Sequence, residues 1–409
     1  MTNTPQVLVV GGGPGGASTA YWLARNGISV HLVEKKHYPR EKACGDGLTP
    51  RAIKQLLDMG FDFDGLDLHR VDGLRAYAGD LVIEMEWPQH SVYPSWGATM
   101  RRADLDGTVA ALAERQGALV EQGTTAMPLL ENDSVVGVHL TNAEGERTVH
   151  PEFVVIADGS NSRFGRGVGA KRRRDFPYGL AVRGYWESPN SDDRMIESQL
   201  DMRDAEGRAM PGYGWVFPLG DGEINVGAGL VSTFKGWKDI NTSHMLDAYA
   251  LNLPEHWKVT PETEHSKPIG GKLPMSLSVG PKVGRNWVLV GDASGAVNPF
   301  NGEGIDYAYE TGRMAAAHVA NALAGNSLAL AEYADELEAV YGDYHRVARV
   351  FVKVIGNPTI MKTLTTVGIR NKPLMEWTLK VMANLLDPEE AKVTEHIYTA
   401  IERTVNVGS

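Results

Sequence analysis

A glycine-rich turn after the first apolar strand constrains the fold of this chain more than any other feature. Val7–Val10 is a continuous apolar run, which is typical of a strand buried on both faces of a parallel sheet. Gly11, Gly13 and Gly16 follow it in the pattern Gly-x-Gly-x-x-Gly, ahead of a helix-forming segment. The first glycine permits the turn, the second lets backbone approach a pyrophosphate, and the third allows close packing of helix on strand. The pattern predicts a βαβ unit that binds a dinucleotide.

The second strand of this unit ends in an acid that agrees with dinucleotide binding. Glu34 lies 18 residues after Gly16, a spacing that suits a carboxylate accepting from a ribose hydroxyl. The same charge would repel the 2′-phosphate of NADP. Pro14 and Gly15 complete the turn, where the helix N-terminus offers unpaired N–H groups to phosphates. A glycine-rich turn of some other α/β protein is the alternative interpretation.

Composition excludes several classes of protein. The net charge of -11 argues against a nucleic-acid partner, because phosphate binding needs a basic face. Cys44 is the single cysteine, so there is no internal disulfide and no Cys-rich zinc site, and we expect no metal. We find no signal segment and no apolar run of about 18 residues. The expected location is therefore the cytoplasm, with peripheral membrane contact left open.

A second fingerprint lies far downstream. Trp287–Val290 is an apolar strand that leads into Gly291-Asp292, a Gly- and Pro-containing loop, and a long helix from about Gly304. This order resembles the second fingerprint of the FAD enzymes of the p-hydroxybenzoate hydroxylase and glutathione reductase group. The resemblance implies that Asp292 binds the ribityl chain of FAD. It also implies that the flavin is lined by Pro299, Asn301, Gly302 and Gly304. A surface loop rich in turn formers is the alternative.

A third segment, "FVVIADGSNSRFGR", resembles the DG motif of flavin hydroxylases, which implies that Asp158 lies near the flavin. The usual arginine falls three residues after the serine, whereas Arg163 and Arg166 fall at other distances, so its counterpart stays open. Related enzymes place another arginine near the flavin where Arg102 stands, and a surface charge is the alternative for Arg101 or Arg102. The expected FAD site also includes Arg40, Gly45 and Asp46.

The middle of the chain reads as antiparallel strands. Alternating runs flank Gly79-Asp80 and Gly220–Gly222, which predicts two hairpins, and Tyr178–Trp186 and Met195–Met202 are further strands. We expect an α/β (α+β) fold: a p-hydroxybenzoate hydroxylase-like FAD-binding Rossmann domain with an inserted antiparallel-sheet substrate domain and a C-terminal helical module. The expected boundaries are 1–70, 99–175 and 281–330 for FAD binding, 71–98 and 176–280 for substrate, and 331–409 for the module.

The second hairpin carries a more specific pattern. Tyr213-x-Trp215-x-Phe217-Pro218, followed by Gly227-x-Gly229, resembles the signature of the geranylgeranyl reductase family, which also carries a Cys-Gly pair like Cys44-Gly45. The resemblance spans roughly Val7 to Ala316 and is strongest to the menaquinone reductases of actinobacteria. It implies that Cys44, Tyr213 and Trp215 act in catalysis. It also implies a substrate site of Tyr213, Trp215, Phe217, Pro218, Gly227 and Gly229. The alternatives are an aromatic core and a packing role for Cys44.

Basic residues gather in two segments of this acidic chain. Tyr344–Leu386 holds seven basic residues against one acid, interleaved with apolar positions. This predicts contact with an anionic membrane surface, and the alternative is a helix packed on the core with a solvated basic face. Lys171–Arg174 reads as a solvated loop, with a docking patch for NADPH phosphates or an acidic electron carrier as the alternative.

These features together predict an FAD-dependent reductase that saturates an isoprenyl double bond of a polyprenyl lipid, with menaquinone as the expected substrate. We find no second dinucleotide turn, so the reductant is expected to visit transiently, as NADPH or a protein electron carrier. A flavin-dependent monooxygenase or halogenase is the alternative, although the halogenase pattern WxWxIP is altered here at Tyr213 and Phe217. The double bond, the number of bonds reduced, the proton donor and the oligomeric state stay open.

Overall fold

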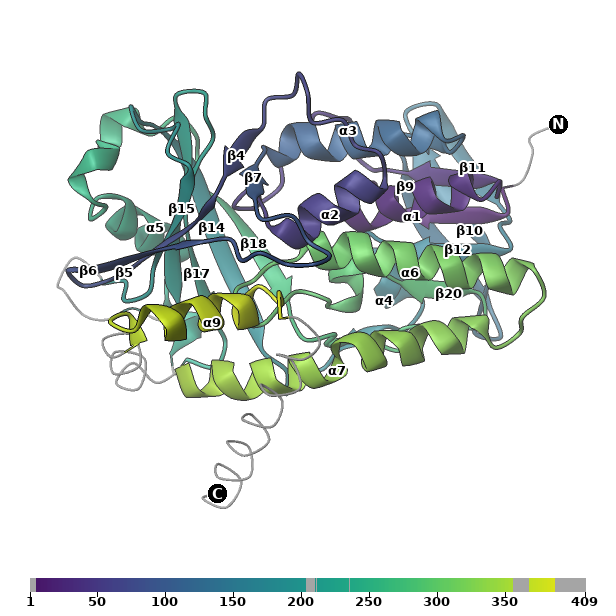
Figure 1. Cartoon of the computed structure of the whole chain (residues 1–409). Coiled ribbons are helices and arrows are strands. Elements are labelled where there is room, and N and C mark those ends of the chain that lie inside the picture. The colour runs from purple at the N-terminus through teal and green to yellow at the C-terminus, as the bar shows by residue number, and fades with distance from the viewer. Residues whose placement is uncertain (1–4, 204–209, 211, 235, 356–367, 387–409) are drawn as a thin grey trace, which may run out of the picture.

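The computed structural model describes residues 5–203, 210, 212–234, 236–355 and 368–386. Figure 1 shows an α/β unit and an antiparallel sheet lying side by side. Within the described ranges, five parallel strands form the sheet of the α/β unit. In order across this sheet they are β20 (Trp287–Leu289), β12 (Phe153–Ile156), β1 (Val7–Val10), β2 (Val30–Val33) and β8 (Leu119–Glu121).

Strand β1 is buried on both faces, which explains its uninterrupted apolar sequence. Val7 and Val9 pack in a core with three helices, α1 (Pro14–Arg25), α3 (Arg102–Arg115) and α6 (Ile305–Leu323). Leu8 and Val10 pack on the opposite face, against the layer formed by β9 (Thr125–Glu131), β10 (Ser134–Asn142) and β11 (Gly145–Val149). The predicted βαβ unit is confirmed, since β1 and β2 pair in parallel around α1.

The antiparallel sheet has seven strands in the described part of the chain. Across the sheet they are β18 (Ile269–Pro274), β14 (Tyr178–Glu187), β17 (Glu223–Val231), β16 (Tyr213–Pro218), β15 (Met195–Gln199), β5 (Gly73–Ala78) and β6 (Leu81–Glu86). Its neighbouring strands pair in antiparallel register except β15 and β5, which pair in parallel. Both predicted hairpins are confirmed, because β5 pairs with β6 and β16 with β17 in antiparallel register. The sheet thus draws on two separate stretches of sequence, while the boundaries of the domains stay a prediction.

Alternation along β16 gives the sheet two different faces. Val216 packs in a core with Leu246 and Tyr249 of α5 (Thr242–Ala250). A Cβ added to Gly214 would lie 2.3 Å from the Tyr249 ring, so the helix sits directly on this face. Tyr213, Trp215 and Phe217 alternate with these residues and therefore point to the other face, toward the α/β unit.

Ahead of the C-terminal helices, the remaining helices, turns and strands of the described residues are short. The remaining helices and turns are α2 (Pro50–Asp58), α4 (Arg163–Gly167), η1 (Trp237–Asp239), η2 (Glu255–Trp257), η3 (Pro261–Thr263) and η4 (Gly291–Ser294). The remaining strands are β3 (Gly47–Leu48), β4 (His69–Val71), β7 (Gly97–Thr99), β13 (Lys171–Arg172) and β19 (Val279–Gly280). Strand β13 pairs with β19 as a two-stranded ribbon, and β7 lies between β3 and β4.

The C-terminal helices pack on both bodies. Helix α7 (Ala329–Ile355) runs beneath the molecule in Figure 1. At one end Tyr333 donates to the carbonyl of Leu289, and at the other Thr233 donates to the carbonyl of Val352. Helix α9 (Lys372–Met382) lies along β5 and β6. Leu379 is buried there with Ile83.

The helical module predicted at 331–409 is therefore described only in part, and 356–367 and 387–409 lie outside the described residues. Many described apolar positions of α7 and α9 contribute to cores of the protein, which is what the alternative of a packed helix with a solvated basic face requires, whereas Val340 and Leu374 are exposed. Within the described ranges, no helix is both long enough and apolar enough to cross a membrane.

Candidate active site

The glycine turn has the close contacts that its spacing requires. Gly11 has φ +103°, in the left-handed region that favours glycine. A Cβ on Gly16 would lie 1.8 Å from the carbonyl oxygen of Gly11, so no side chain fits between helix and strand. A Cβ on Gly13 would meet nothing closer than Arg40 at 3.7 Å and Arg102 at 4.0 Å. The turn is thus packed behind Gly16 and open in front of Gly13.

Two arginines face this opening and share one acid. Arg102 donates through Nε and Nη2 to the two oxygens of Asp106, both at 2.8 Å, and Arg40 Nη2 lies 3.0 Å from Asp106. Arg40 Nε is buried and has no hydrogen-bond partner among the described residues. Buried guanidinium groups bind phosphates strongly. This arrangement, beside a helix N-terminus, fits the pyrophosphate of a dinucleotide.

The neighbouring arginine points elsewhere. Arg101 forms ion pairs with Asp221 and Glu223 at the turn between β16 and β17, whereas Arg102 is 6% exposed and lies at the glycine turn. Asp106 was not predicted from the sequence. Its signal is the Arg-x-x-x-Asp spacing on α3, which places the two side chains on one helix face.

Glu34 is fixed at the end of β2. It is 4% exposed, its Oε2 accepts from the N–H of Gly12 at 2.8 Å, and its Oε1 accepts from the N–H of Lys36 at 3.0 Å. The two backbone donors orient the carboxylate beside the glycine turn, where the ribose of a dinucleotide bound at that turn would lie. Binding of the ribose by Glu34 stays a prediction.

The second fingerprint lies at the N-terminus of α6. Asp292 is in η4, and a Cβ on Gly304, the residue before α6, would lie 3.4 Å from its carboxylate. Pro299 is buried and Gly302 has φ +79°. The side chain of Asn301 donates to the carbonyl of Met382 at 3.0 Å, so it ties this loop to the end of α9.

The DG motif follows β12. One oxygen of Asp158 accepts from the N–H of Phe164 at 2.9 Å, and the other is buried without a partner in the described part of the chain. Burial raises the pKa of Asp158, and a hydrogen bond from Ser162 opposes the rise. Arg163 and Arg166 are both exposed on α4, and Arg166 donates to the side chain of Asn161 at 3.2 Å.

The loop that holds Cys44 is hydrogen-bonded to the antiparallel sheet through Asp46. Asp46 is fully buried, and it accepts from the hydroxyl of Tyr185 at 2.6 Å, from Asn225 at 2.8 Å and from the N–H of Arg102 at 3.1 Å. Asn225 also donates to the carbonyl of Cys44 at 3.0 Å and accepts from the indole N–H of Trp215 at 3.0 Å. One amide therefore links the cysteine loop to the aromatic strand.

Neither Asn225 nor Tyr185 was predicted from the sequence. Asn225 is the only polar side chain within the otherwise apolar run Ile224–Val231, and that is the signal which marks it. Nearby, Arg183 is 1% exposed and donates to Glu41 at 2.5 Å, while its Nε and Nη1 are buried without partners among the residues described.

Cys44 is half-buried beside Arg102. Burial raises the pKa of its thiol above the ordinary value, and the positive charge of Arg102 opposes the rise. The thiol therefore stays protonated at neutral pH, and a role of Cys44 in catalysis stays a prediction.

The aromatic residues of β16 form a continuous face against this loop. The ring centroids of Tyr213 and Trp215 are 5.9 Å apart, and those of Trp215 and Phe217 are 6.2 Å apart. A Cβ on Gly45 or on Gly47 would lie 2.8 Å from the Phe217 ring. The hydroxyl of Tyr213 donates to the carbonyl of Asn301. The structure thus brings the cysteine loop, the aromatic face and the second fingerprint together, while Pro218 is buried at the end of the same strand.

The two glycines of the β17 signature lie under the Trp215 indole. A Cβ on Gly227 would lie 2.0 Å from Trp215 Cζ2, whereas a Cβ on Gly229 would meet nothing closer than 3.6 Å. Gly227 therefore makes room for the indole. Direct contact of either glycine with substrate stays a prediction.

This difference gives a matched pair of variants. Gly227→Ala is expected to displace Trp215 and to destabilise the fold by about 1–3 kcal/mol, because the added methyl overpacks a buried ring. Gly229→Ala is the control and should change stability by no more than about 0.5 kcal/mol. Thermal unfolding and tryptophan fluorescence measure both effects, and equal behaviour of the two variants would contradict the role assigned to Gly227.

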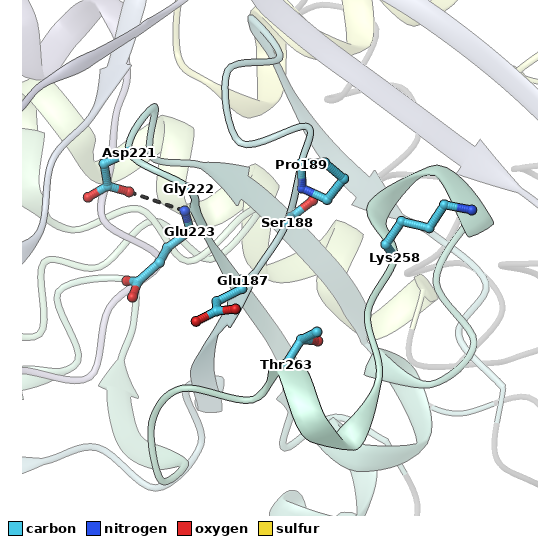
Figure 2. A pocket seen from close by; sticks show the side chains of 8 residues that line it. All are labelled: Glu187, Ser188, Pro189, Asp221, Gly222, Glu223, Lys258 and Thr263. Carbon is cyan, nitrogen blue, oxygen red and sulfur yellow. Dashed lines mark hydrogen bonds between the residues drawn. The ribbon is translucent and has the colours of Figure 1, made fainter.

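A separate hollow of about 500 Å³ lies at the edge of the antiparallel sheet (Figure 2). Its lining includes Glu187, Asp221, Glu223 and Lys258, and none of the predicted site residues. Asp221 and Glu223 are already engaged by Arg101, and Asp221 also accepts from the N–H of Glu223 at 3.3 Å. The predicted site residues lie outside this hollow.

Comparison with known proteins agrees with this arrangement. The family described as FAD binding domain matches residues 4–179. Menaquinone reductase of Mycobacterium tuberculosis is 37% identical over 391 residues, which cover 95% of this chain and 93% of the relative. Digeranylgeranylglycerophospholipid reductase of Methanocella arvoryzae is 29% identical over 372 residues, which cover 87% of this chain and 90% of the relative.

Solved structures show the same fold. A geranylgeranyl bacteriochlorophyll reductase-like protein of Thermoplasma acidophilum matches with a TM-score of 0.77 at 25% identity, over 90% of this chain and 92% of that chain. A flavin-dependent brominase matches with a TM-score of 0.73 at 18% identity, over 99% and 100%, and this likeness concerns the fold alone. The expected fold class and the expected cofactor, FAD, are confirmed. The chain belongs to the geranylgeranyl reductase family of FAD-dependent oxidoreductases.

Proposed function

We propose that this oxidoreductase saturates an isoprenyl double bond of a polyprenyl lipid, and that the lipid is the side chain of menaquinone. The observation that carries the proposal is the aromatic face of Tyr213, Trp215 and Phe217, which lies against the loops of Cys44 and of Asn301. The relative in Mycobacterium tuberculosis that bears the name menaquinone reductase supports the choice of lipid. Bound FAD supplies the electron pair for such a reduction.

The aromatic face suits an apolar chain whose reaction develops positive charge. An isolated prenyl double bond has no neighbouring carbonyl to withdraw electrons, so its reduction needs orientation, a proton and exclusion of water. Aromatic rings bind apolar surface and attract a developing cation at their faces. The hydrogen bonds of Tyr213 to Asn301 and of Trp215 to Asn225 fix two of these rings.

Cys44 is the proposed proton donor, since its thiol is protonated and lies in the loop that contacts the aromatic face. Glu303 is a second acid beside this face. Burial and the neighbouring Asp306 raise its pKa well above the usual range, and one of its oxygens is buried without a partner in the described ranges. Glu303 lies two residues after Asn301, whose carbonyl accepts from Tyr213, and its proposed role is to resupply a proton to the site.

Two further parts of the proposal concern partners. A menaquinone substrate resides in the membrane, so we place the protein at the inner face of the cell membrane, in peripheral contact through its basic C-terminal residues. NADPH or a protein electron carrier supplies the electrons. The absence of a second dinucleotide turn in the sequence supports a donor that binds transiently.

An anaerobic assay tests the proposal. The FAD-loaded protein is reduced with dithionite and mixed with menaquinone in detergent, and the lipid is then analysed by mass spectrometry. Dithionite also converts the quinone ring to the quinol, so the lipid is first reoxidised to the quinone; the expected product is then heavier by two hydrogen atoms for each side-chain bond reduced. A product that forms only with oxygen and carries an added oxygen or halogen would instead assign the chain to the monooxygenases or halogenases. Bleaching of the flavin by NADPH without dithionite would identify the donor.

A further inference from the structure

A second cavity, of about 340 Å³, lies between α7, the ribbon of β13 and β19, and the segment 276–282. Its lining carries five ionisable side chains, Arg173, Lys282, Glu338, His345 and Arg349. Four of these are basic residue types, in a chain whose net charge is -11. None of the residues that line it belongs to the glycine turn or to the aromatic face of the site described above.

The guanidinium groups of two arginines that line this cavity lie over the same aromatic ring. Arg173 Cζ lies 4.1 Å and Arg349 Cζ 4.4 Å from the centroid of the Phe176 ring. Asp175 pairs with Arg173 at 2.7 Å. Burial lowers the pKa of Arg349, Glu338 opposes this, and the positive charge of Arg173 lowers it further. Like charges held this close favour binding of an anion.

Buried polar groups in the cavity lack partners. His345 is 1% exposed, and neither of its ring nitrogens has a hydrogen-bond partner among the described residues. Burial lowers its pKa to about 3, so the imidazole is neutral and has one N–H to donate. Ser276 is 2% exposed, and its hydroxyl is likewise unpartnered within the described chain. Buried polar groups are normally satisfied, so these two mark a place for a ligand.

The floor of the cavity is joined to the second fingerprint. Lys282 is inserted beneath it and donates to the carbonyls of Leu277, Val279 and Ser294, so all three of its N–H groups are used by the backbone of this segment and of η4. The N–H of Ser276 donates to the carbonyl of Val297 at 3.0 Å, and the N–H of Leu277 to the carbonyl of Gly295 at 2.7 Å. Whatever binds in the cavity therefore contacts the segment that directly supports the loop 291–297.

We propose that this cavity is a phosphate-binding site, formed by Arg173, Arg349, His345 and Ser276, and distinct from the place of the FAD pyrophosphate. Guanidinium, imidazole N–H and hydroxyl groups together are donors that recognise a phosphate oxygen set. The phosphate of a nucleotide and the phosphate of a lipid headgroup share this chemistry. Binding of a phosphate in this cavity is separate from the proposed reduction, and it can be measured without turnover of the enzyme.

The test uses the FAD-loaded full chain and isothermal titration calorimetry. The probes are inorganic pyrophosphate and 2′,5′-ADP, with flotation on vesicles that contain phosphatidylglycerol as a third arm. Arg349→Gln should weaken binding roughly tenfold, because it removes a charge-assisted hydrogen bond. Arg346→Gln is the matched control: it removes the same charge from the same helix, from a side chain that does not line the cavity, and should change affinity less than about twofold.

Ser276→Ala separates a ligand contact from a structural one. Since the hydroxyl has no partner within the described chain, this variant should keep the melting temperature of the unliganded protein yet weaken anion binding a few-fold. Tight binding of 2′,5′-ADP identifies a nucleotide source, and binding to vesicles alone identifies a headgroup. The proposal is overturned if no probe binds, or if Arg349→Gln and Arg346→Gln weaken binding equally.

Discussion

Replacement of Cys44 by alanine should leave FAD bound and lower turnover of the prenyl lipid by about 10²–10⁴-fold, the range that a positioned acid contributes. The reason is positional. Asn225 holds the cysteine loop beside the aromatic face, because its side chain donates to the carbonyl of Cys44 and to the carboxylate of Asp46. The same side chain accepts from the indole N–H of Trp215 and so fixes that ring as well. Loss of the thiol leaves these bonds in place. Flavin absorbance and anaerobic single-turnover rates measure the two quantities separately.

The pH profile of the wild-type enzyme gives an independent check on Cys44. The pKa of the thiol is raised by burial above its ordinary value of about 9, so the proton-donating form persists through the neutral range. Turnover limited by this donor should be flat across neutral pH and fall only above about pH 9. Cys44→Ser, with a far weaker acid, should be as slow as Cys44→Ala. Unchanged turnover in either variant would reduce Cys44 to a packing residue.

A variant of Glu303 distinguishes the role of Glu303 from that of Cys44. Glu303→Gln keeps the size of the side chain but removes its acidic proton, and burial beside Asp306 raises the pKa of the wild-type carboxyl well above its usual range. If Glu303 only resupplies protons, the variant should keep its first turnover and slow later ones. A first turnover as slow as that of Cys44→Ala would make Glu303 the direct donor.

Much of the fold could be predicted because it depends on local patterns. The run Val7–Val10, the glycine spacing and the alternation along β5, β6, β16 and β17 are each determined within about ten residues of sequence, and these elements were predicted correctly. The aromatic alternation also indicated which side chains share a face of β16. Such patterns report periodicity and turn chemistry, which do not depend on distant parts of the chain.

The parts that were missed depend on contacts between distant segments. Arg183 meets Glu41 across 142 positions, and Asp46 meets Tyr185 across 139, so no local pattern marks them. Asn225 could be noticed as a polar residue in an apolar strand, but its two partners could not be named. The cavity beside Arg349 was likewise hidden, because it forms where α7 passes Arg173 and Ser276. Residues 171–174 are exposed, as the solvated-loop interpretation requires, yet Arg173 also lines this cavity.

Gly13→Ala and Gly16→Ala should both lower activity, through different physical routes. At Gly16 the added Cβ would lie 1.8 Å from the carbonyl oxygen of Gly11, so the turn must open even without cofactor. At Gly13 the nearest atoms are the guanidinium groups of Arg40 and Arg102, at 3.7 and 4.0 Å, so the protein itself accommodates the methyl group. That methyl then occupies the space where the pyrophosphate meets the backbone.

The apoproteins therefore distinguish the two glycines. The Gly13→Ala apoprotein should have the same melting temperature as the wild-type apoprotein. Its affinity for FAD should be about 10–100-fold lower, which corresponds to about 1–3 kcal/mol of overpacking against the cofactor. Gly16→Ala should lower the melting temperature of the apoprotein as well, because its clash lies within the protein. Thermal unfolding of both apoproteins measures the change in stability, and titration with FAD measures the change in affinity. If Gly13→Ala binds FAD normally, the pyrophosphate does not lie between Gly13 and the two arginines, and the cofactor placement argued from these contacts is wrong.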